Sequence, residues 1–148
     1  MAIRSFRDTF LSNFYGLKPG EERLSIVFDD VAYPTVEYAY VAAKLTDLAL
    51  REEVRLLPKP GQAKSFLKDR GLTERSGWDE MKLAVMEDLV RQKFAHPKLA
   101  AMLLATGDEE LIEGNTWDTF WGVDTETGVG ENHLGRIVMK IRDELRRA

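Results

Sequence analysis

The sequence predicts an α+β fold that is mostly α, with a small antiparallel sheet, in one domain of residues 1–148. Three observations lead to this prediction. Apolar residues recur at helical spacing over long stretches of the chain. The extended segments are few and short, and they do not alternate with helices as βαβ units would. A chain of 148 residues with 44% hydrophobic content is also long enough to bury a core.

The first elements expected are two strands and a long helix. The stretch LSIVFDDVAYP predicts strands at residues 24–28 and 31–33, joined by an Asp-Asp turn. Thr35 is expected to cap a helix that continues to about Leu57, where two prolines end it.

Four further helices are predicted from apolar spacing, from prolines at helix starts and from glycines at helix ends. They cover residues 61–69, 78–94, 97–106 and 133–147. The helices at 35–57 and 78–94 are expected to pack together. Short extended segments are expected at residues 110–114 and 117–123, followed by a loop at residues 124–132.

Composition restricts the possible partners. The chain has no cysteine, so it has neither a disulfide nor a thiolate metal ligand, which favours a cytoplasmic location. No apolar run approaches the roughly 20 residues of a membrane span. The net charge of −4 gives no general attraction to nucleic acid, and the basic ending KIRDELRR is expected to be a solvated helix face. The two histidines lie far apart, so no metal is predicted, and no cofactor is expected either.

Glu37 and Lys44 form the first candidate site. Glu37 lies in the first turn of the long predicted helix, where the helix dipole favours an anion. Tyr40, Lys44 and Leu48 follow at helical spacing on the same, mainly apolar face. A carboxylate and an ammonium group on such a face need each other or a ligand. The pattern therefore fits a helix-start anion and a binding site about equally well.

The stretch NTWDTFWG forms the second candidate site. Trp117, Phe120 and Trp121 crowd around Asp118. Core aromatics beside a turn-forming aspartate explain this pattern simply. The stretch also leads into a glycine-containing loop, a place where an exposed indole can stack on a base or a sugar.

The loop itself, TGVGENHLG, has glycines before a helix, but its spacing differs from the dinucleotide-binding fingerprint. Backbone amides at the start of the following helix can still receive a phosphate, with Asn132 as a plausible cap.

Several motifs occur together in a fixed order: FLSNFY, YPTVEYAYVAAK, GWDEMK with VMEDLVRQKF, LLATG, DTFWG and GVGENHLGRIVMKIR. In this order they resemble the NADAR family, also called YbiA-like, over nearly the whole chain. The resemblance implies an N-glycosidase that cleaves the C1′–N bond of a (phospho)ribosyl or ADP-ribosyl compound. Such compounds include early intermediates of riboflavin synthesis and ADP-ribosylated guanine, so a nucleic-acid base carrying ADP-ribose is a possible partner. The alternative is a module that binds ADP-ribose or a nucleotide without cleaving it.

The resemblance also implies roles for particular residues. The implied catalytic residues are Glu37, Lys44 and Asp118. The implied substrate-binding residues are Asn13, Phe14, Trp78, Trp121, Gly122, Gly128, Gly130 and Asn132.

Glu37 would stabilise the positive charge that builds on the ribose, and Asp118 would hold water or ribose hydroxyls. Lys44 would either neutralise a phosphate or attack C1′ as a neutral amine. Trp78 and Trp121 would stack on the base, and Gly128, Gly130 and Asn132 would line a phosphate pocket.

The chain departs from the family pattern in the helix that carries Glu37. It has Tyr38 where the family usually has His, and Val41 and Ala43 where the family usually has glutamines. These changes could mark a member that binds without cleaving, or one with a different substrate.

Overall fold

The computed structural model describes residues 2–3 and 5–148, and these residues divide into two compact units. One unit combines the first twelve residues with residues 94–148, and the other comprises residues 13–93. Helices predominate in both units, and the strands are two or three residues long. The predicted α+β class is therefore confirmed. Within the described residues, no helix has the length and apolar character needed to cross a membrane.

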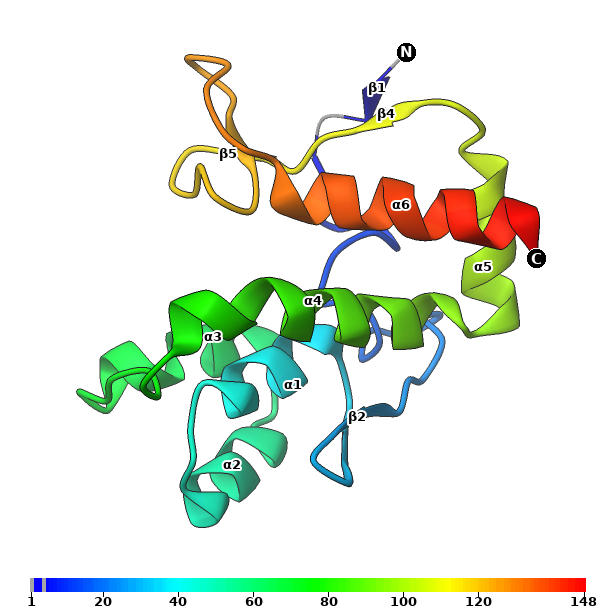
Figure 1. The fold of residues 1–148 in the computed structure, drawn as a ribbon. Coiled ribbons are helices and arrows are strands. Elements are labelled where there is room, and N and C mark those ends of the chain that lie inside the picture. Colours follow the sequence, from blue (N-terminus) through cyan, green and yellow to red (C-terminus); the bar gives the residue numbers. More distant parts are fainter. Residues whose placement is uncertain (1, 4) are drawn as a thin grey trace. The chain divides into compact units, whose positions relative to one another are not determined.

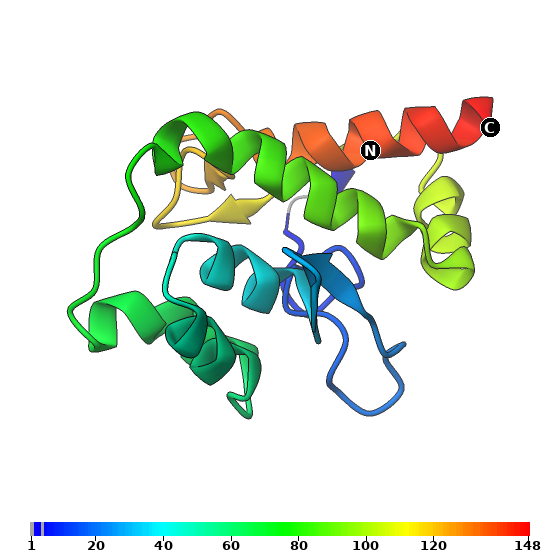
Figure 2. The same cartoon turned by 60° about the horizontal axis from the view of Figure 1, so that its bottom comes forward.

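A β-hairpin begins the regular structure of the unit of residues 13–93. Strands β2 (Ile26–Phe28) and β3 (Val31–Tyr33) pair antiparallel, as the sequence predicted. Asp29 and Asp30 form the two-residue turn, and both have positive φ angles, of 47° and 65°. Aspartate tolerates this left-handed conformation better than most residues, which explains the Asp-Asp turn. The hairpin packs against α1 (Val36–Ala43), shown in blue and cyan in Figure 2.

The prediction of one long helix from Thr35 to about Leu57 is wrong, because the structure has two helices there. Helix α1 ends at Ala43, and α2 runs over Leu48–Arg55. Asp47 starts the second helix, since its side chain accepts a 3.0 Å hydrogen bond from the backbone N–H of Leu50. The buried Arg51 side chain donates to the carbonyl of Leu45 at 2.8 Å, which stabilises the break.

The break also corrects the predicted apolar face, because Leu48 belongs to the second helix and is 74% exposed. The face that begins at Glu37 therefore ends with α1 and does not include Leu48.

Helices α3 (Pro60–Asp69) and α4 (Trp78–Phe94) complete this unit, close to their predicted bounds. Helix α3 packs against α1. The phenol of Tyr38, fully buried, donates a 2.8 Å hydrogen bond to the carbonyl of Leu57, just after α2. The predicted contact of the first and fourth helices is made by the rings of Tyr40 and Trp78, whose centroids are 5.3 Å apart.

The other unit is built on two helices and two pairs of strands. Helix α5 (Pro97–Ala105) and helix α6 (His133–Arg147) pack together, and α6 also packs against β4 (Figure 1). Strand β1 (Ala2–Ile3) pairs with β4 (Glu110–Leu111), and β5 (Gly114–Asn115) pairs with β6 (Val123–Asp124). Both pairs are parallel, so they add to the one antiparallel pair that the sequence predicted. Most of the segment at 117–123 consists of bends rather than extended chain, which corrects that prediction.

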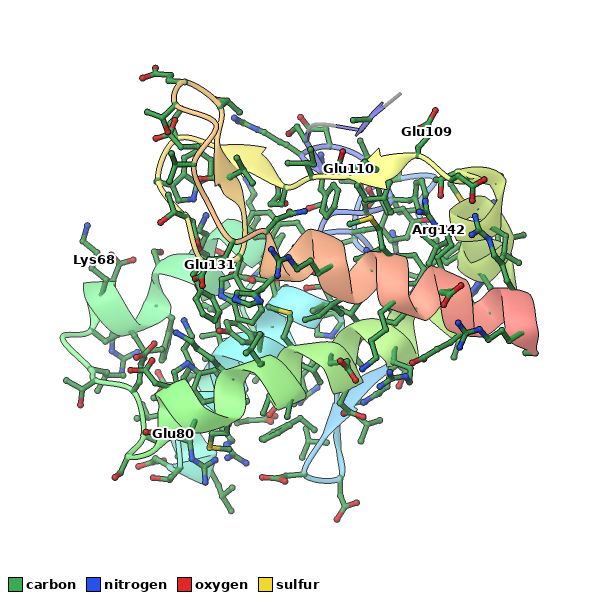
Figure 3. The ribbon with its side chains drawn as sticks, turned by 45° about the horizontal axis from the view of Figure 1, so that its top comes forward. Lys68, Glu80, Glu109, Glu110, Glu131 and Arg142 are labelled. Carbon is green, nitrogen blue, oxygen red and sulfur yellow. The ribbon has the colours of Figure 1, made fainter. Side chains whose placement is uncertain are left out.

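The basic end of the chain is only partly a solvated face. Arg142 is 6% exposed, and its Nη1 donates a 2.9 Å hydrogen bond to Oγ1 of Thr106. Thr106 is the C-cap of α5, and its hydroxyl in turn donates to the carbonyl of Leu103 at 2.6 Å. Figure 3 shows Arg142 extending from α6 on the side of α5. Arg142 therefore joins the two helices, and burial lowers the pKa of its guanidinium.

Candidate active site

Glu37 is placed by two contacts at the start of α1. Thr35 is the N-cap, and its side chain accepts a hydrogen bond from the backbone N–H of Tyr38. The backbone N–H of Glu37 donates a 3.1 Å hydrogen bond to the carbonyl of Asn13. The turn that contains Asn13 and Phe14 is thus attached to the first turn of α1. Both side chains of this turn are half-buried.

Burial and nearby charges shift the pKa of the Glu37 carboxyl in opposite directions. Burial is the largest, and it raises the pKa of the group above its ordinary value. The charges of Lys44 and Lys64 act in the opposite direction and favour the ionised form. The dipole of α1 also favours an anion in its first turn. Glu37 is therefore a carboxylate with limited access to water and two positive neighbours.

Lys44 lies at the end of α1, close to an acidic and an aromatic side chain. It is the C-cap of α1, and 22% of its side chain is exposed. Its Nζ lies 3.9 Å from a carboxylate oxygen of Glu74 and 5.1 Å from the centroid of the Tyr40 ring. The Lys44 carbonyl accepts a 2.7 Å hydrogen bond from the backbone N–H of Arg75, which attaches the α3–α4 connection to the end of α1.

Trp78 is a core residue in this structure, and its stacking on a base stays a prediction. Only 3% of it is exposed, and its ring packs at a tilt against Tyr40, which is 6% exposed. An indole buried to this extent has no open face for a ligand. Further along α4, the Met86 sulfur accepts a hydrogen bond from the Asn13 amide at 3.5 Å. A thioether is a weak acceptor, so this contact leaves the Asn13 amide free of a strong structural commitment.

The other predicted residues lie in the unit of residues 1–12 and 94–148. Three of them, Asp118, Trp121 and Gly122, belong to a segment we call the tryptophan loop, residues 115–122. Asp118 shapes this loop: its Oδ1 accepts hydrogen bonds from the backbone N–H groups of Phe120 and Trp121, both at 2.8 Å. The Trp121 ring packs edge-on against Phe120 at 4.8 Å and lies 6.5 Å from His133. Asp118 is therefore at least a turn-forming residue, and its carboxylate has a fixed orientation.

Close packing explains two of the predicted glycines. A Cβ on Gly122 would collide with the carbonyl of Glu113, and a Cβ on Gly130 would collide with the carbonyl of Gly122. Gly128 has a φ of 73°, and its N–H donates to the carbonyl of Asp124 at 2.8 Å, so it closes a tight turn. All three glycines thus have structural reasons to be present.

The backbone N–H groups at the start of α6 also make hydrogen bonds within the protein. The backbone N–H groups of Asn132, His133 and Leu134 donate to carbonyls of the tryptophan loop, at 3.0–3.2 Å. The Asn132 side chain accepts from the Glu113 N–H and donates to the Leu111 carbonyl, both at 2.9 Å. Asn132 occupies the N-cap position, but its side chain makes no capping hydrogen bond. These contacts give Asn132 a structural role, and the phosphate pocket expected at Gly128, Gly130 and Asn132 stays a prediction.

The predicted residues thus form two local groups, one in each unit. Asn13, Phe14, Glu37, Lys44 and Trp78 belong to the unit of residues 13–93. The group in the other unit consists of Asp118, Trp121, Gly122, Gly128, Gly130 and Asn132.

Sequence reasoning missed three residues of the first group. Tyr40 and Glu74 contact Lys44, and Lys64 acts on Glu37 through its charge. Tyr40 lies at helical spacing from Glu37, which was a usable signal. Lys64 and Glu74 lie in a separate helix and in a connection, where no periodicity relates them to the site. Among the residues that the structure describes, no cluster of three His, Asp or Glu side chains could hold a metal ion.

Comparison with known proteins agrees with this fold and these motifs. The model of the NADAR domain matches residues 4–146, and the chain therefore belongs to the NADAR family. The solution structure of the Escherichia coli protein YbiA is similar, with a TM-score of 0.79 and 33% identity, over 99% of this chain and 84% of that one. The resemblance inferred from the motifs is confirmed.

Two of the related sequences are named N-glycosidases, and a third is named for riboflavin biosynthesis. The chain is 37% identical to the N-glycosidase YbiA of Escherichia coli, over 81% of this chain and 75% of the relative. It is 34% identical to an N-glycosidase of Nostoc punctiforme, over 82% of this chain and 80% of the relative. It is also 39% identical to a riboflavin biosynthesis protein of Vibrio vulnificus, over 92% of this chain but only 35% of that longer protein. These names agree with the enzyme class predicted from the sequence.

Proposed function

We propose that the protein is an N-glycosidase that hydrolyses the C1′–N bond of a ribosyl compound. The observation that carries this proposal is the environment of Glu37, a carboxylate with limited access to water at a helix start, with Lys44 and Lys64 acting on its charge. Membership of the NADAR family and the similarity to proteins named N-glycosidases support the reaction class.

Glu37 has two tasks in this reaction. As the C1′–N bond breaks, its electron pair leaves with the base nitrogen, which takes up a proton, and positive charge builds on the ribose. The Glu37 carboxylate stabilises that charge. It then accepts a proton from the water molecule whose oxygen bonds to C1′. Both tasks require the ionised form, which the two lysines favour.

Two alternative roles are proposed for Lys44. It neutralises a phosphate of the substrate, or it attacks C1′ as a neutral amine. Its Nζ lies 3.9 Å from a carboxylate oxygen of Glu74 and 5.1 Å from the centroid of the Tyr40 ring.

Asp118 is our proposed second carboxylate. Two backbone N–H groups fix its Oδ1, so the orientation of the group is set before any substrate arrives. Preorganised acceptors of this kind can hold water or ribose hydroxyl groups without a reorganisation cost. Among the possible substrates, an N-riboside of the riboflavin pathway is supported by the name of the Vibrio vulnificus relative. ADP-ribosylated guanine is the second candidate, on the basis of the family resemblance.

A product assay tests the proposal. The protein is incubated with riboflavin-pathway N-ribosides and with ADP-ribosylated guanosine, and released base and free ribosyl product are measured. We expect release, and a loss of about 10²–10³ in turnover for Glu37→Gln, because that variant lacks the stabilising charge. Glu80→Gln, which changes an exposed carboxylate of α4, is the matched control and should keep full activity.

Two results would contradict this proposal. The first is tight binding of these compounds without release of base, which would identify a binding module. The second is full activity of Glu37→Gln.

A further inference from the structure

The most exposed tryptophan of the chain lies next to Asp118. Trp117 is 66% exposed, whereas Trp78 is 3% exposed and Trp121 is half-buried. A packed indole buries more apolar area than almost any other side chain, so leaving one in water forgoes a large stabilisation. An indole in this position, beside a carboxylate that is a candidate for substrate binding, is available to contact a ligand.

The backbone that carries Trp117 is fixed by hydrogen bonds of the tryptophan loop. The Asn115 side chain is buried, and its Oδ1 accepts hydrogen bonds from the N–H groups of Trp117 and Asp118, at 2.8 and 2.6 Å. Asp118 in turn accepts from the N–H groups of Phe120 and Trp121. One ordered loop therefore carries both the indole and the carboxylate, and little backbone freedom would be lost when a ligand binds.

The closeness of Trp117 to Asp118 suits the base of a riboside. The Cα atoms of consecutive residues are about 3.8 Å apart, so the indole extends from a point beside the residue proposed to hold the ribose hydroxyl groups. In an N-riboside, a single bond joins the base to that ribose. A base whose ribose is held by Asp118 is therefore within reach of the Trp117 ring.

An exposed indole favours a planar base as its ligand. Base–aromatic stacking requires no particular pattern of hydrogen bonds, because every base has a π face. The overlap grows with ring area, so a bicyclic base gains more from the contact than a monocyclic one. Val129, in the loop that follows, is 64% exposed, but its aliphatic side chain has no ring to stack.

We propose that Trp117 is a specificity-determining residue whose indole stacks on the base of the substrate. The inference rests on the proposed function for the position of the ribose at Asp118. It adds the group that contacts the base and a preference that follows from it: bicyclic bases bind more tightly than monocyclic ones.

Three ligands that share a phosphorylated ribose and differ in the base test this role without turnover. Isothermal titration calorimetry compares guanosine 5′-monophosphate, uridine 5′-monophosphate and ribose 5-phosphate, and the wild type should bind them in that order of decreasing affinity. Trp117→Ala should bind guanosine monophosphate about tenfold more weakly. Trp117→Phe should keep most of the affinity, because a phenyl ring also stacks. Val129→Ala, the matched control, should bind like the wild type, and ribose 5-phosphate should bind equally to all four proteins.

Tryptophan fluorescence provides a second readout. Because Trp117 is the most exposed indole, it should be the one most strongly quenched by acrylamide, and guanosine monophosphate should protect it. In Trp117→Phe the nucleotide should protect no tryptophan. The same protection in Trp117→Phe as in the wild type would assign the contact to another indole and overturn the proposal.

Three binding results would also overturn it. In the first, the wild type binds guanosine monophosphate no more tightly than uridine monophosphate or ribose 5-phosphate. In the second, Trp117→Ala binds guanosine monophosphate as Val129→Ala does. In the third, Trp117→Ala loses as much affinity for ribose 5-phosphate as for the nucleotide, which would mean that the substitution disturbs Asp118 instead of a stacking contact.

Turnover measurements separate this inference from the proposed function. If no riboside is cleaved but Trp117→Ala still weakens nucleotide binding selectively, the enzyme assignment fails and the base site stands. If ribosides are cleaved and Trp117→Ala has the kcat/KM of the wild type for every base, the base site fails and the enzyme assignment stands.

Discussion

The backbone N–H of Glu37 donates a 3.1 Å hydrogen bond to the carbonyl oxygen of Asn13. The bond attaches the turn at residues 10–15 to the first turn of α1, 24 positions later in the sequence. The polar residue within that aromatic stretch thus has a structural task for its backbone, while its side-chain amide makes only a weak contact with Met86. The Asn13 carbonyl therefore positions the start of α1, whereas contact of its side-chain amide with a ligand stays a prediction.

The first prediction concerns the cost of keeping Glu37 ionised. Its pKa is raised in the folded protein, so the folded state holds the proton more tightly than the unfolded state does. The free energy of unfolding contributed by this group therefore falls as the pH rises from the ordinary value of 4.5, which applies to the unfolded chain, through the raised pKa of the folded state. Glu37→Gln should be more stable than wild type at pH 7, although it is less active. Urea denaturation at pH 4 and pH 7 measures this difference.

The same shift should appear in the rate of catalysis. Because the ionised form is required, turnover should fall as the pH is lowered through the raised pKa, at a pH above the ordinary value of 4.5. Glu80→Gln should follow the wild type in both measurements. A Glu37→Gln variant that is less stable than wild type at pH 7 would contradict the prediction.

The second prediction concerns Lys93, which is 1% exposed within α4. Burial lowers its pKa to about 7, although the charge of Glu21 opposes this shift and the Tyr15 ring lies 5.5 Å from its Nζ. An unfolded lysine keeps its proton to about pH 10.4, so the unfolded state binds more protons between these values. Stability should therefore rise with pH from 7 to about 10, with a slope of up to about 1.4 kcal/mol per pH unit.

Lys93→Met should remove this slope and raise stability at pH 7, because it keeps the length of the side chain without the charge. Chemical denaturation at pH 7, 8 and 9 compares it with the wild type. Parallel curves for the two proteins would show that Lys93 is not the group responsible.

The third prediction concerns Tyr38, which stands where the family usually has histidine. Its hydroxyl donates to the Leu57 carbonyl at 2.8 Å, and the side chain is fully buried. Tyr38→Phe leaves that carbonyl without this donor, which should cost about 1–3 kcal/mol of stability. Turnover by the folded variant should stay within about twofold of wild type. A large loss of turnover in a fully folded Tyr38→Phe would instead assign the hydroxyl to catalysis.

The fourth prediction separates two roles of Asp118. An asparagine at this position keeps the Oδ1 acceptor for the N–H groups of Phe120 and Trp121 but removes the charge. Asp118→Asn should therefore retain the thermal stability of the wild type and lose turnover. Asp118→Ala should lose both, with a destabilisation of about 1–2 kcal/mol. Equal activity of Asp118→Asn and wild type would leave Asp118 with its turn-forming role alone.

Local signals in the sequence predicted much of the fold. The helices at 78–94 and 133–147 have the predicted bounds, because a long apolar period leaves little ambiguity. The break after Lys44 was missed, because the apolar spacing continues across it and only Asp47 signals a new helix start. The parallel strand pairs were also missed. Each has two residues per strand, too few for a pattern, and β1 and β4 are also distant in sequence.

The candidate site was predicted less completely than the fold. Glu37 and Lys44 lie on one helix, so their spacing was informative. The burial of Trp78 depends on Tyr40, a contact between helices that no local pattern contains. The Asn132 side chain binds backbone groups of Glu113 and Leu111, which are about 20 positions away. The sequence indicated which residue types could form a site, but not which of these side chains make structural contacts within the fold.

The hydrogen bond from the Arg75 N–H to the Lys44 carbonyl bears on how substrate range evolves in this protein. A backbone bond places no requirement on side-chain identity. The connection between α3 and α4 can therefore exchange side chains while its chain path stays attached beside the candidate site. Glu74, which contacts Lys44, lies in this connection. Libraries that vary residues 73–76 should consequently yield folded proteins with altered ligand preference, and this segment is the natural starting point for redesigning selectivity.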